Sequence, residues 1–552
     1  LTWVRIMGGT TSANVGVFYG QVSIEGWRLG ASQFSGNVDV SVDAIDMFEQ
    51  LANTGTPSSV YAIEVKADTP RAWYRLGESS GTVATDSSGN GYHGTYEGGA
   101  TFNARAGLVD NDPDGAIGFD GVDDYVVVPP AAVTSLTSAT SVAVWFEVAD
   151  GAVIASSQSL FSAAPTTTHR LFLILKTDGK LQFSANTGSA SSAADSTAAY
   201  NDGSEHFAVG TWNGTDTVSL YVDGVLVSSD NSMAPTQSDG NAGPGVRIGS
   251  SFAGTTTSLL AGTLDEVTVY DTALSAARVL AHYNAGTNPW ASELTSARIT
   301  HILDAIAFPA TLRTIGTGQS SMPAASLNTD ALSALLDVNK AERGELYIDH
   351  ADGGKLRFRG RHARWTEARS ITSQATFGDS GAEVTYSAID IQDDRIVNNA
   401  VVQRFGGANV TARDSASETQ YQIRSYSETG LLLLTDAEVE SRANAIVAEK
   451  KDRHRRVRSI TLEPRKSTHS AWAQVFARAI GDRITVKWRP PYGGTYTYDS
   501  YIIGISHRWT PGSGLRTTFA LEPVPYAATG APYFIWDTST WDSGTSSTRW
   551  GF

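Results

Sequence analysis

Short strand-like runs joined by two-residue turns fill the region between about residues 66 and 290, and this pattern limits the fold more than any other feature. Three turn signals lie between apolar runs: Asp178-Gly179, Asn213-Gly214 and Asp223-Gly224. Such pairs favour tight hairpin turns, because both turn positions adopt a positive φ. The runs Leu171–Lys176 and Lys180–Phe183 therefore predict one hairpin. Many short strands with regular turns predict an all-β sandwich.

The segment before this region predicts strands followed by a helix. Val38–Val42 alternates apolar and polar residues, as a half-buried strand does. Val15–Val22 is rich in β-branched and aromatic residues and predicts a second strand. Asp43 can cap a helix over Ala44–Leu51, because an aspartate side chain accepts from the free N–H groups of a first helical turn.

From Ser292 onwards the chain shows mixed α and β patterns. Ser292 can cap a helix whose apolar stripe contains Ile299, Ile302, Leu303 and Ile306. Further elements are expected at about Thr329–Arg343 (helix), Glu345–Asp349 with Lys355–Arg359 (hairpin), Thr435–Lys451 (helix with a Thr435/Glu438 capping box), and Ser459–Leu462, Arg483–Trp488 and Tyr501–Ile505 (strands).

These patterns predict a chain of several domains, since 552 residues exceed a single core. We expect an α+β scaffold interrupted by the sandwich. The predicted boundaries are residues 1–65 for the first part of the scaffold, 66–290 for the insert, 291–524 for the second part, and 525–552 for a Ser-, Thr- and Trp-rich tail.

Short phrases within the insert occur in an order that resembles the laminin-G-like (concanavalin A-like) jelly-roll family. They are Ala72–Glu78, Asp86–Gly91, Phe119–Val126, Leu220–Gly224, Leu264–Asp271 and Ala273–Ser275. The resemblance implies a two-sheet jelly roll that binds carbohydrate. Members of this family often hold one Ca²⁺ near a rim of the sandwich.

The flanks of the insert contain the phrases Arg298–Ile306, Arg313–Gly318, Glu342–Asp349 and Phe534–Trp541. Through these phrases the flanks, residues 1–65 and 291–552, resemble minor tail proteins of long-tailed bacteriophages, especially those of actinobacteria. The resemblance implies a tail-hub scaffold of β-barrel and α+β domains at the tail tip of a siphovirus virion. Its partners would be two further copies in a homotrimeric ring, together with the distal tail protein, the tape measure and neighbouring tip proteins.

Composition excludes several classes of partner and chemistry. The chain has no cysteine, which removes disulfides, thiolate metal sites and cysteine nucleophiles. Lys66 to Trp290 contains 9 Lys plus Arg and 23 Asp plus Glu, a net charge of −14 (9 − 23), which argues against nucleic-acid binding by the insert. No apolar run is long enough to span a bilayer, so no membrane insertion is expected.

The laminin-G-like resemblance gives candidate calcium ligands at Asp86, Asn90 and Asp265. Loop carboxylates and amide oxygens of this kind are the ligands that Ca²⁺ prefers. The alternative is that Asp86 and Asn90 shape a turn while Asp265 accepts from backbone amides. A second acidic run, Asp110–Gly115, has calcium-loop spacing but lacks a glutamate at its twelfth position, so an acidic turn before a strand is favoured.

Tyr92 and His93 lie in a glycine-rich loop and are the candidate residues for stacking on a sugar ring. Trp145, Trp212 and Tyr221 lie in apolar strand-like runs, which predicts core positions. The basic run Lys450–Arg458 starts in the last turn of a helix, where cations complement the helix dipole, so a solvated face or an acidic neighbour is favoured over nucleic acid.

The sequence contains no complete motif of a laminarinase-like hydrolase or a serine protease, and no catalytic activity is expected. The insert lacks the Glu-x-Asp-x-(x)-Glu run of laminarinase-like hydrolases, and Asp265 and Glu266, as strand neighbours, should point to opposite faces. Gly378–Gly381 resembles a serine-protease phrase but lacks the other triad motifs. The sequence therefore predicts a tail-tip protein that displays a glycan-binding module, with a secreted or surface lectin as the main alternative and a glycan hydrolase as a lesser one.

Overall fold

A computed structural model describes residues 3–10, 13–31, 38–55, 59–110, 112, 114–133, 138–164, 169–187, 190–232, 234–235, 245–251, 258–324, 329–380, 383–393, 395–464, 469–491, 493–510, 514–524, 533–534 and 549–550. The chain divides into two compact units. Unit 1 comprises Leu1–Pro57, Ser292–Pro323 and Thr329–Phe552, and unit 2 comprises Ser58–Ala291 and Ala324–Asn328. Both flanks of the insert thus contribute to one unit.

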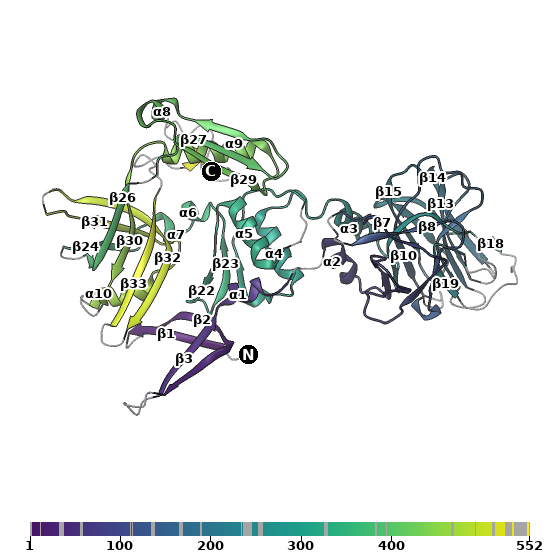
Figure 1. The fold of residues 1–552 in the computed structure, drawn as a ribbon, viewed down its shortest axis with the longest axis horizontal. Coiled ribbons are helices and arrows are strands. Elements are labelled where there is room, and N and C mark those ends of the chain that lie inside the picture. Colours follow the sequence, from purple (N-terminus) through teal and green to yellow (C-terminus); the bar gives the residue numbers. More distant parts are fainter. Residues whose placement is uncertain are drawn as a thin grey trace. The chain divides into compact units, whose positions relative to one another are not determined.

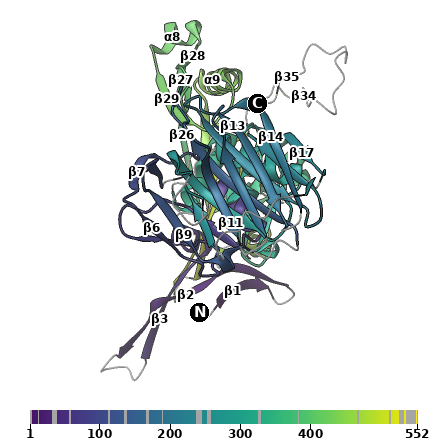
Figure 2. The ribbon, with the colours of Figure 1, turned by 90° about the vertical axis from the view of Figure 1, so that its right-hand side faces the viewer.

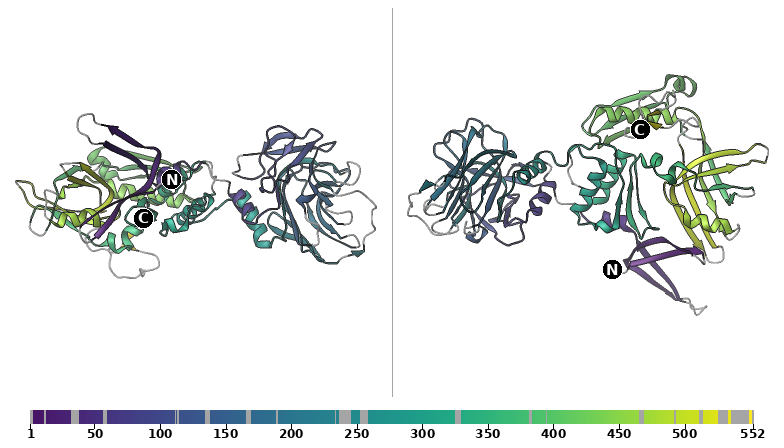
Figure 3. Two further views of the ribbon diagram at one scale, coloured as in Figure 1. Left: turned by 90° about the horizontal axis from the view of Figure 1, so that it is seen from below. Right: turned by 180° about the vertical axis from the view of Figure 1, so that it is seen from behind.

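Unit 2 is a sandwich of two antiparallel sheets, and Figures 2 and 3 show its strands in two layers. The first sheet has the order β17 (Val225–Asp230), β16 (Val218–Val222), β15 (Glu205–Trp212), β10 (Thr140–Glu147), β20 (Ala261–Tyr270), β8 (Gly115–Asp120) and β7 (Thr101–Ala106), with β4 (Ala72–Tyr74) paired to β20. The second has the order β18 (Ala234–Pro235), β14 (Ala190–Ala199), β13 (Lys180–Asn186), β12 (Arg170–Leu175), β11 (Gln158–Ala164), β19 (Gly245–Ile248), β9 (Tyr125–Val128), β6 (Gly94–Glu97) and β5 (Val83–Ala84).

The core lies between the two sheets and follows from strand alternation. Along β13 every second side chain is buried, and Phe183 packs directly over Gly210 of the opposite sheet. The predicted hairpins are confirmed: β12 pairs with β13, β15 with β16, and β16 with β17. Asp223 and Gly224 both have positive φ, as their turn type requires.

Strand β10 is buried along both faces because two helices cover its outer side. These are α2 (Val60–Ala67) and α3 (Ala276–Thr287), which contact each other. Trp145 of β10 stacks on Phe207 and Tyr283, with ring centroids 5.0 and 6.0 Å apart. Trp145, Trp212 and Tyr221 are buried, which confirms their predicted core positions. Helix α2, which precedes the boundary predicted at residue 66, is grouped with the sandwich unit.

Unit 1 contains several smaller sheets with helices (Figure 1). Its sheets are β1 (Trp3–Thr10), β2 (Ala13–Ala31) and β3 (Val38–Ile45); β21 (Arg313–Ile315), β23 (Lys355–Arg359) and β22 (Glu345–Asp349); β28 (Val410–Arg413), β27 (Asn399–Arg404) and β29 (Ser425–Leu431); β25 (Val384–Thr385), β24 (Thr376–Gly378), β31 (Arg483–Trp488), β32 (Tyr496–Thr510), β33 (Gly514–Pro523), β30 (Arg455–Leu462) and β26 (Ala388–Asp393); and β34 (Tyr533–Phe534) with β35 (Arg549–Trp550).

The helices of unit 1 are α1 (Met47–Ala52), α4 (Thr295–Ala305), α5 (Ala331–Glu342), α6 (Ala363–Thr366), α7 (Ala368–Ile371), α8 (Ser415–Tyr421), α9 (Asp436–Lys450) and α10 (His469–Ala477). Contacts between α1 and α5 and between α10 and β1 join the two flanks. No helix of the described residues is long and apolar enough to cross a bilayer. The seven-stranded sheet has β25 and β26 as its two end strands. Within the described residues these two strands do not pair with each other, so the sheet does not close into a barrel there.

Two predicted helix caps are wrong. Asp46, instead of Asp43, caps α1 by accepting from the Phe48 N–H at 2.9 Å, because β3 continues to Ile45. Ser292 has a φ of 62° and donates its N–H to the Met322 carbonyl, so α4 starts later, at Thr295. The capping box of α9 is confirmed. Of the predicted tail, residues 525–532, 535–548 and 551–552 lie outside the described residues.

Candidate functional site

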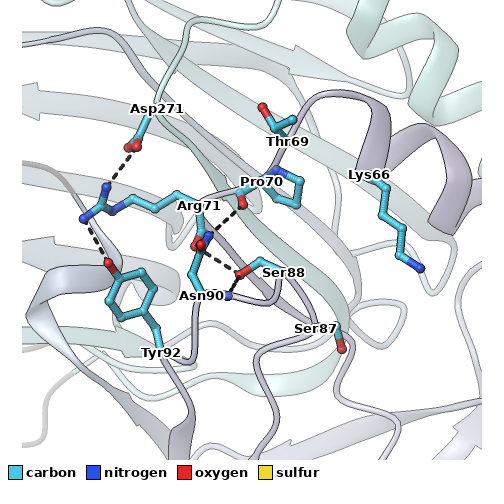
Figure 4. Close-up of a pocket in the computed structure, with 9 residues that line it drawn as sticks. All are labelled: Lys66, Thr69, Pro70, Arg71, Ser87, Ser88, Asn90, Tyr92 and Asp271. Atoms are coloured by element: carbon cyan, nitrogen blue, oxygen red, sulfur yellow. Dashed lines mark hydrogen bonds and ion pairs between the residues drawn. The ribbon is translucent and has the colours of Figure 1, made fainter.

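A pocket of about 510 Å³ opens on the sandwich beside the pairing of its first and last strands. Figure 4 shows the side chains that surround it: Lys66, Thr69, Pro70, Arg71, Ser87, Ser88, Asn90, Tyr92 and Asp271. Because Ala72 of β4 pairs with Val269 of β20, the residues before β4 and after β20 lie side by side. This pairing brings Arg71 and Asp271 together.

Asp86 builds the turn that forms one wall of the pocket. Its Oδ1 accepts from the Trp73 and Ser88 N–H groups at 3.0 and 2.9 Å, and its Oδ2 accepts from the Tyr92 N–H at 2.8 Å. Burial opposes the charge, but the hydrogen bonds from Ser88 and from the backbone N–H groups of Trp73 and Tyr92 lower the pKa of the Asp86 carboxyl. Both carboxylate oxygens therefore serve the turn, as the structural alternative to calcium binding predicted.

Asn90 and Arg71 are held by backbone carbonyls. The Asn90 amide donates to the Pro70 and Arg71 carbonyls at 3.3 and 2.9 Å. The Arg71 guanidinium donates to the Ala131 carbonyl from Nε at 2.9 Å and from Nη2 at 2.7 Å, and to Asp271 Oδ2 from Nη1 at 2.9 Å. Hydrogen bonds thus hold Arg71, Asp271 and Asn90 in place within the protein, which lowers the cost of ordering these side chains on binding.

Of the two predicted stacking residues, Tyr92 lines the pocket and His93 does not. The Tyr92 ring is half-buried against the core, and the Arg71 guanidinium carbon lies 5.4 Å from its centroid. Its hydroxyl is nevertheless at the pocket, 3.4 Å from Arg71 Nη2. The His93 side chain is exposed, and its Nδ1 accepts from the Asp86 N–H at 3.1 Å. Arg71 therefore covers part of the Tyr92 ring, which reduces the ring surface available for the predicted stacking on a sugar.

Asp265, the third predicted calcium ligand, lies in a different network. Its Oδ2 accepts from the Leu108 N–H at 2.8 Å, and its side chain is buried. Next to it, Glu266 has a φ of 54°, and the pairing of β20 with β10 shifts register there. This bulge interrupts the regular alternation of β20 at Glu266, and both Asp265 and Glu266 are buried.

Glu266 belongs to a buried cluster of carboxylates around Arg75. Oxygens of Asp112, Asp114 and Glu266 lie within 4.8 Å of one another, and Arg75 forms ion pairs with all three. The second Glu266 oxygen accepts from the Trp73 indole N–H. Asp112 and Asp114 of the acidic run thus lie just before β8, where Arg75 supplies the positive charge, while residues 111 and 113 lie outside the described residues.

The cluster shifts the pKa values of its carboxyl groups. Burial, together with hydrogen bonding to Asp112 and the charge of Glu266, raises the pKa of Asp114 to about 8, although Arg75 opposes the shift. Burial also raises the pKa of Glu266 to about 7, against the lowering effect of Arg75. Burial and the Glu266 charge raise the pKa of Asp265 well above its ordinary value. None of these residues lines the pocket.

Three residues of the basic run at the end of α9 pair with acidic neighbours. Lys451 contacts Asp414 at 3.0 Å, and Arg453 and Arg455 both contact Asp393. Within the described part of the chain these contacts fit the predicted acidic neighbour better than a nucleic-acid surface.

Comparison with known proteins places the sandwich fold. Residues 120–280 match the family model described as the concanavalin A-like lectin/glucanases superfamily. Over these residues the sandwich is similar to concanavalin A-like lectins and glucanases. This confirms the jelly-roll part of the predicted fold class, whereas the match does not extend to the flanks. Among curated proteins none matches the sequence.

Several solved structures are similar at low identity. Domain 4 of the extracellular arabinanase AbnA from Geobacillus stearothermophilus, in complex with arabinotriose, is 18% identical with a TM-score of 0.29, covering 39% of this chain and 98% of that one. The receptor-binding domain of a botulinum neurotoxin C/D mosaic serotype is 12% identical with a TM-score of 0.30, and the match covers 39% of this chain and 51% of that one. The binding domain of Paraclostridial Mosquitocidal Protein 1 is 13% identical with a TM-score of 0.32, and the match covers 41% of this chain and 54% of that one. The chain spans about half the length of the two toxin domains, and no functional conclusion follows from these matches.

Sequence reasoning missed Arg71, Asp271 and Lys66 as pocket residues. Arg71 directly precedes the laminin-G-like phrase Ala72–Glu78, and Asp271 ends the phrase Leu264–Asp271. A prediction that these two phrases pair as neighbouring strands would have brought Arg71 and Asp271 to one place.

Proposed function

We propose that this chain is a non-catalytic structural protein of a bacteriophage tail tip, whose sandwich unit binds host-surface glycan through the pocket at Arg71, Asn90, Tyr92 and Asp271. The observation that carries the glycan part is that pocket, where a carboxylate, an amide and a phenol are held in place on a concanavalin A-like sandwich. Sugars are recognised by fixed polar groups of this kind, because each hydroxyl both donates and accepts hydrogen bonds.

The tail-tip part rests on the resemblance of the flanks and on the insertion itself. Segments before and after the sandwich contribute to the same unit, which suits a scaffold that displays a binding module. In this proposal unit 1 assembles as a homotrimer with other tail proteins, including the distal tail protein and the tape measure. Three copies of a weak glycan site would raise the avidity of adsorption.

The absence of catalysis is part of the proposal. Three carboxylates with raised pKa values, Asp114, Glu266 and Asp265, lie outside the pocket, and the first two bind Arg75. A glycosidase needs two carboxyl groups on either side of the bond that is cleaved, with access for substrate. Calcium binding at Asp86, Asn90 and Asp265 stays a prediction, and it is tested by the change in melting temperature on adding Ca²⁺ or a chelator.

Two experiments test the proposal. Antibodies against the full chain should label the tail tip of virions from the phage that encodes it, and averaged images should show threefold density there. The purified chain should also bind host cell-wall polysaccharide, and Asp271→Ala should weaken this binding. A monomeric chain that binds glycan but is absent from virions would support the secreted lectin instead, and release of reducing sugar would support the hydrolase.

A further inference from the structure

The hydrogen bonds within the pocket determine which ligand groups it can satisfy. Asp271 receives the Arg71 guanidinium on Oδ2 at 2.9 Å, and no described residue donates to Oδ1. The Asp271 side chain is 45% exposed, so Oδ1 can be reached by a ligand. This oxygen can only accept, and it therefore requires a donor from the ligand.

Asn90 presents a second acceptor. Both atoms that its amide group faces, the carbonyl oxygens of Pro70 and Arg71, can only accept, so the Nδ2 atom must point toward them. Oδ1 consequently points the other way. Asn90 is exposed, and no described residue donates to its Oδ1. The pocket thus holds two fixed acceptors whose orientation is set by the protein.

The cations at the pocket do not form an anion site. Arg71 already donates to the Ala131 carbonyl and to Asp271, and its guanidinium lies over the Tyr92 ring. Lys66 lies across the pocket from Asp271, with its side chain directed away from the Arg71–Asp271 pair (Figure 4). Its ammonium is 6.0 Å from the centroid of the Trp73 ring.

The negative charge of the surrounding sandwich unit also disfavours an anionic ligand. Between Lys66 and Trp290 the net charge is −14, from 9 basic and 23 acidic residues. A surface of this charge repels a polyanion at low ionic strength and leaves a neutral polymer unaffected.

We infer that the pocket takes a neutral, hydroxyl-rich sugar and excludes anionic glycans, with two sugar hydroxyls donating to Asp271 Oδ1 and Asn90 Oδ1. This inference rests on the proposed glycan binding and specifies its ligand class. Arg71 is a positioning residue in this arrangement, since it orients Asp271. Acidic wall polymers, such as those built on uronic acids or glycerol phosphate, would place a carboxylate or phosphate against two acceptors, which costs binding free energy.

The test uses the full-length chain and immobilised polysaccharides in biolayer interferometry. The neutral probes are arabinogalactan, mannan and dextran, and the anionic probes are polygalacturonate and poly(glycerol phosphate). The variants are Asp271→Ala, Asn90→Ala and Lys66→Ala, with Asp150→Ala as a matched control at an exposed aspartate outside the pocket. Thermal melting of each variant verifies folding.

We expect at least one neutral probe to bind, with an affinity that changes less than about twofold between about 50 and 500 mM NaCl. Asp271→Ala should weaken that affinity about tenfold or more, because a hydrogen bond to a charged group contributes at least this much, and Asn90→Ala should weaken it by a smaller factor. Asp150→Ala, outside the pocket, should leave it within about twofold.

Preferential binding of an anionic probe, lost in Lys66→Ala and suppressed by salt, would overturn the inference and leave the proposed glycan binding intact. Neutral binding that Asp271→Ala and Asn90→Ala do not change would also overturn it, because the ligand would then lie elsewhere. Failure of every probe together with host-wall polysaccharide would instead refute the proposed function itself.

Discussion

Replacing Arg75 by methionine should destabilise the sandwich strongly, because this arginine is the shared partner of three carboxylates. The side chains of Asp112 and Glu266 are 1% and 0% exposed, and that of Asp114 is 20% exposed. Methionine keeps much of the volume but removes the charge. Breaking a buried ion pair from one side typically costs about 3–5 kcal/mol.

The expected loss in the free energy of unfolding lies below the upper end of that range. The Arg75 side chain is 27% exposed, and Asp114 and Glu266 can take up protons. We expect a loss of about 2–4 kcal/mol in the free energy of unfolding at alkaline pH. For a unit of this size, such a loss lowers the melting temperature by about 4–16 °C.

The effect should depend on pH. In the folded sandwich the pKa values of Asp114 and Glu266 are about 8 and about 7, above the ordinary values of 3.8 and 4.5. Groups with raised pKa values contribute stability that is present below their unfolded pKa and lost as pH rises through the folded pKa. The wild-type sandwich should therefore melt at a higher temperature near pH 5.5 than near pH 8.5, and Arg75→Met should widen this difference.

Differential scanning calorimetry of the full chain at both pH values measures these shifts. The matched control is Arg105→Met, since Arg105 also joins two carboxylates, Glu147 and Glu205, but is 37% exposed. Surface pairs contribute no more than about 1 kcal/mol, so the control should move the transition little. Equal shifts for the two variants, or a shift for Arg75→Met that is the same at both pH values, would refute the reasoning.

Gly210→Ala should destabilise the sandwich by about 1–3 kcal/mol, because the new Cβ would lie 2.0 Å from the Phe183 ring. Gly494→Ala is the control, since no atom lies within 4 Å of its new Cβ, and urea unfolding compares the two variants. Thr435→Ala should cost unit 1 about 1 kcal/mol by removing the capping box with Glu438, and an unchanged unfolding midpoint would contradict this. Incubating the chain with host wall polysaccharide should release no reducing ends above a heat-denatured control.

Local signals predicted local structure well. The turn at Asp223-Gly224 follows from two residues that tolerate positive φ, and the α9 capping box follows from residues three apart. Caps were harder where several candidates stand close together, as at Asp43 and Asp46, because the end of β3 decides between them. The bulge at Glu266, where φ is positive and the register of β20 against β10 shifts, was not predicted from the alternating pattern.

The site was only partly predictable for a related reason. Tyr92 and Asn90 were selected from one loop and both line the pocket. Arg71 and Asp271 are 200 positions apart and meet only because β4 pairs with β20, which no local pattern reports. The cluster around Arg75 likewise combines three separate segments, so neither its charge balance nor its pKa shifts could be read from the acidic run alone.

The contact between α2 and α3 has a consequence for how this chain can change over time. Arg278 of α3 binds Glu64 and Asp68, so the two ends of the sandwich are fastened to each other by the unit's own residues. With respect to unit 1, the sandwich unit is therefore equivalent to one long loop between two of its segments. A unit closed by its own residues can be exchanged or deleted without removing residues of unit 1, so under the proposed function the binding specificity can change independently of the scaffold.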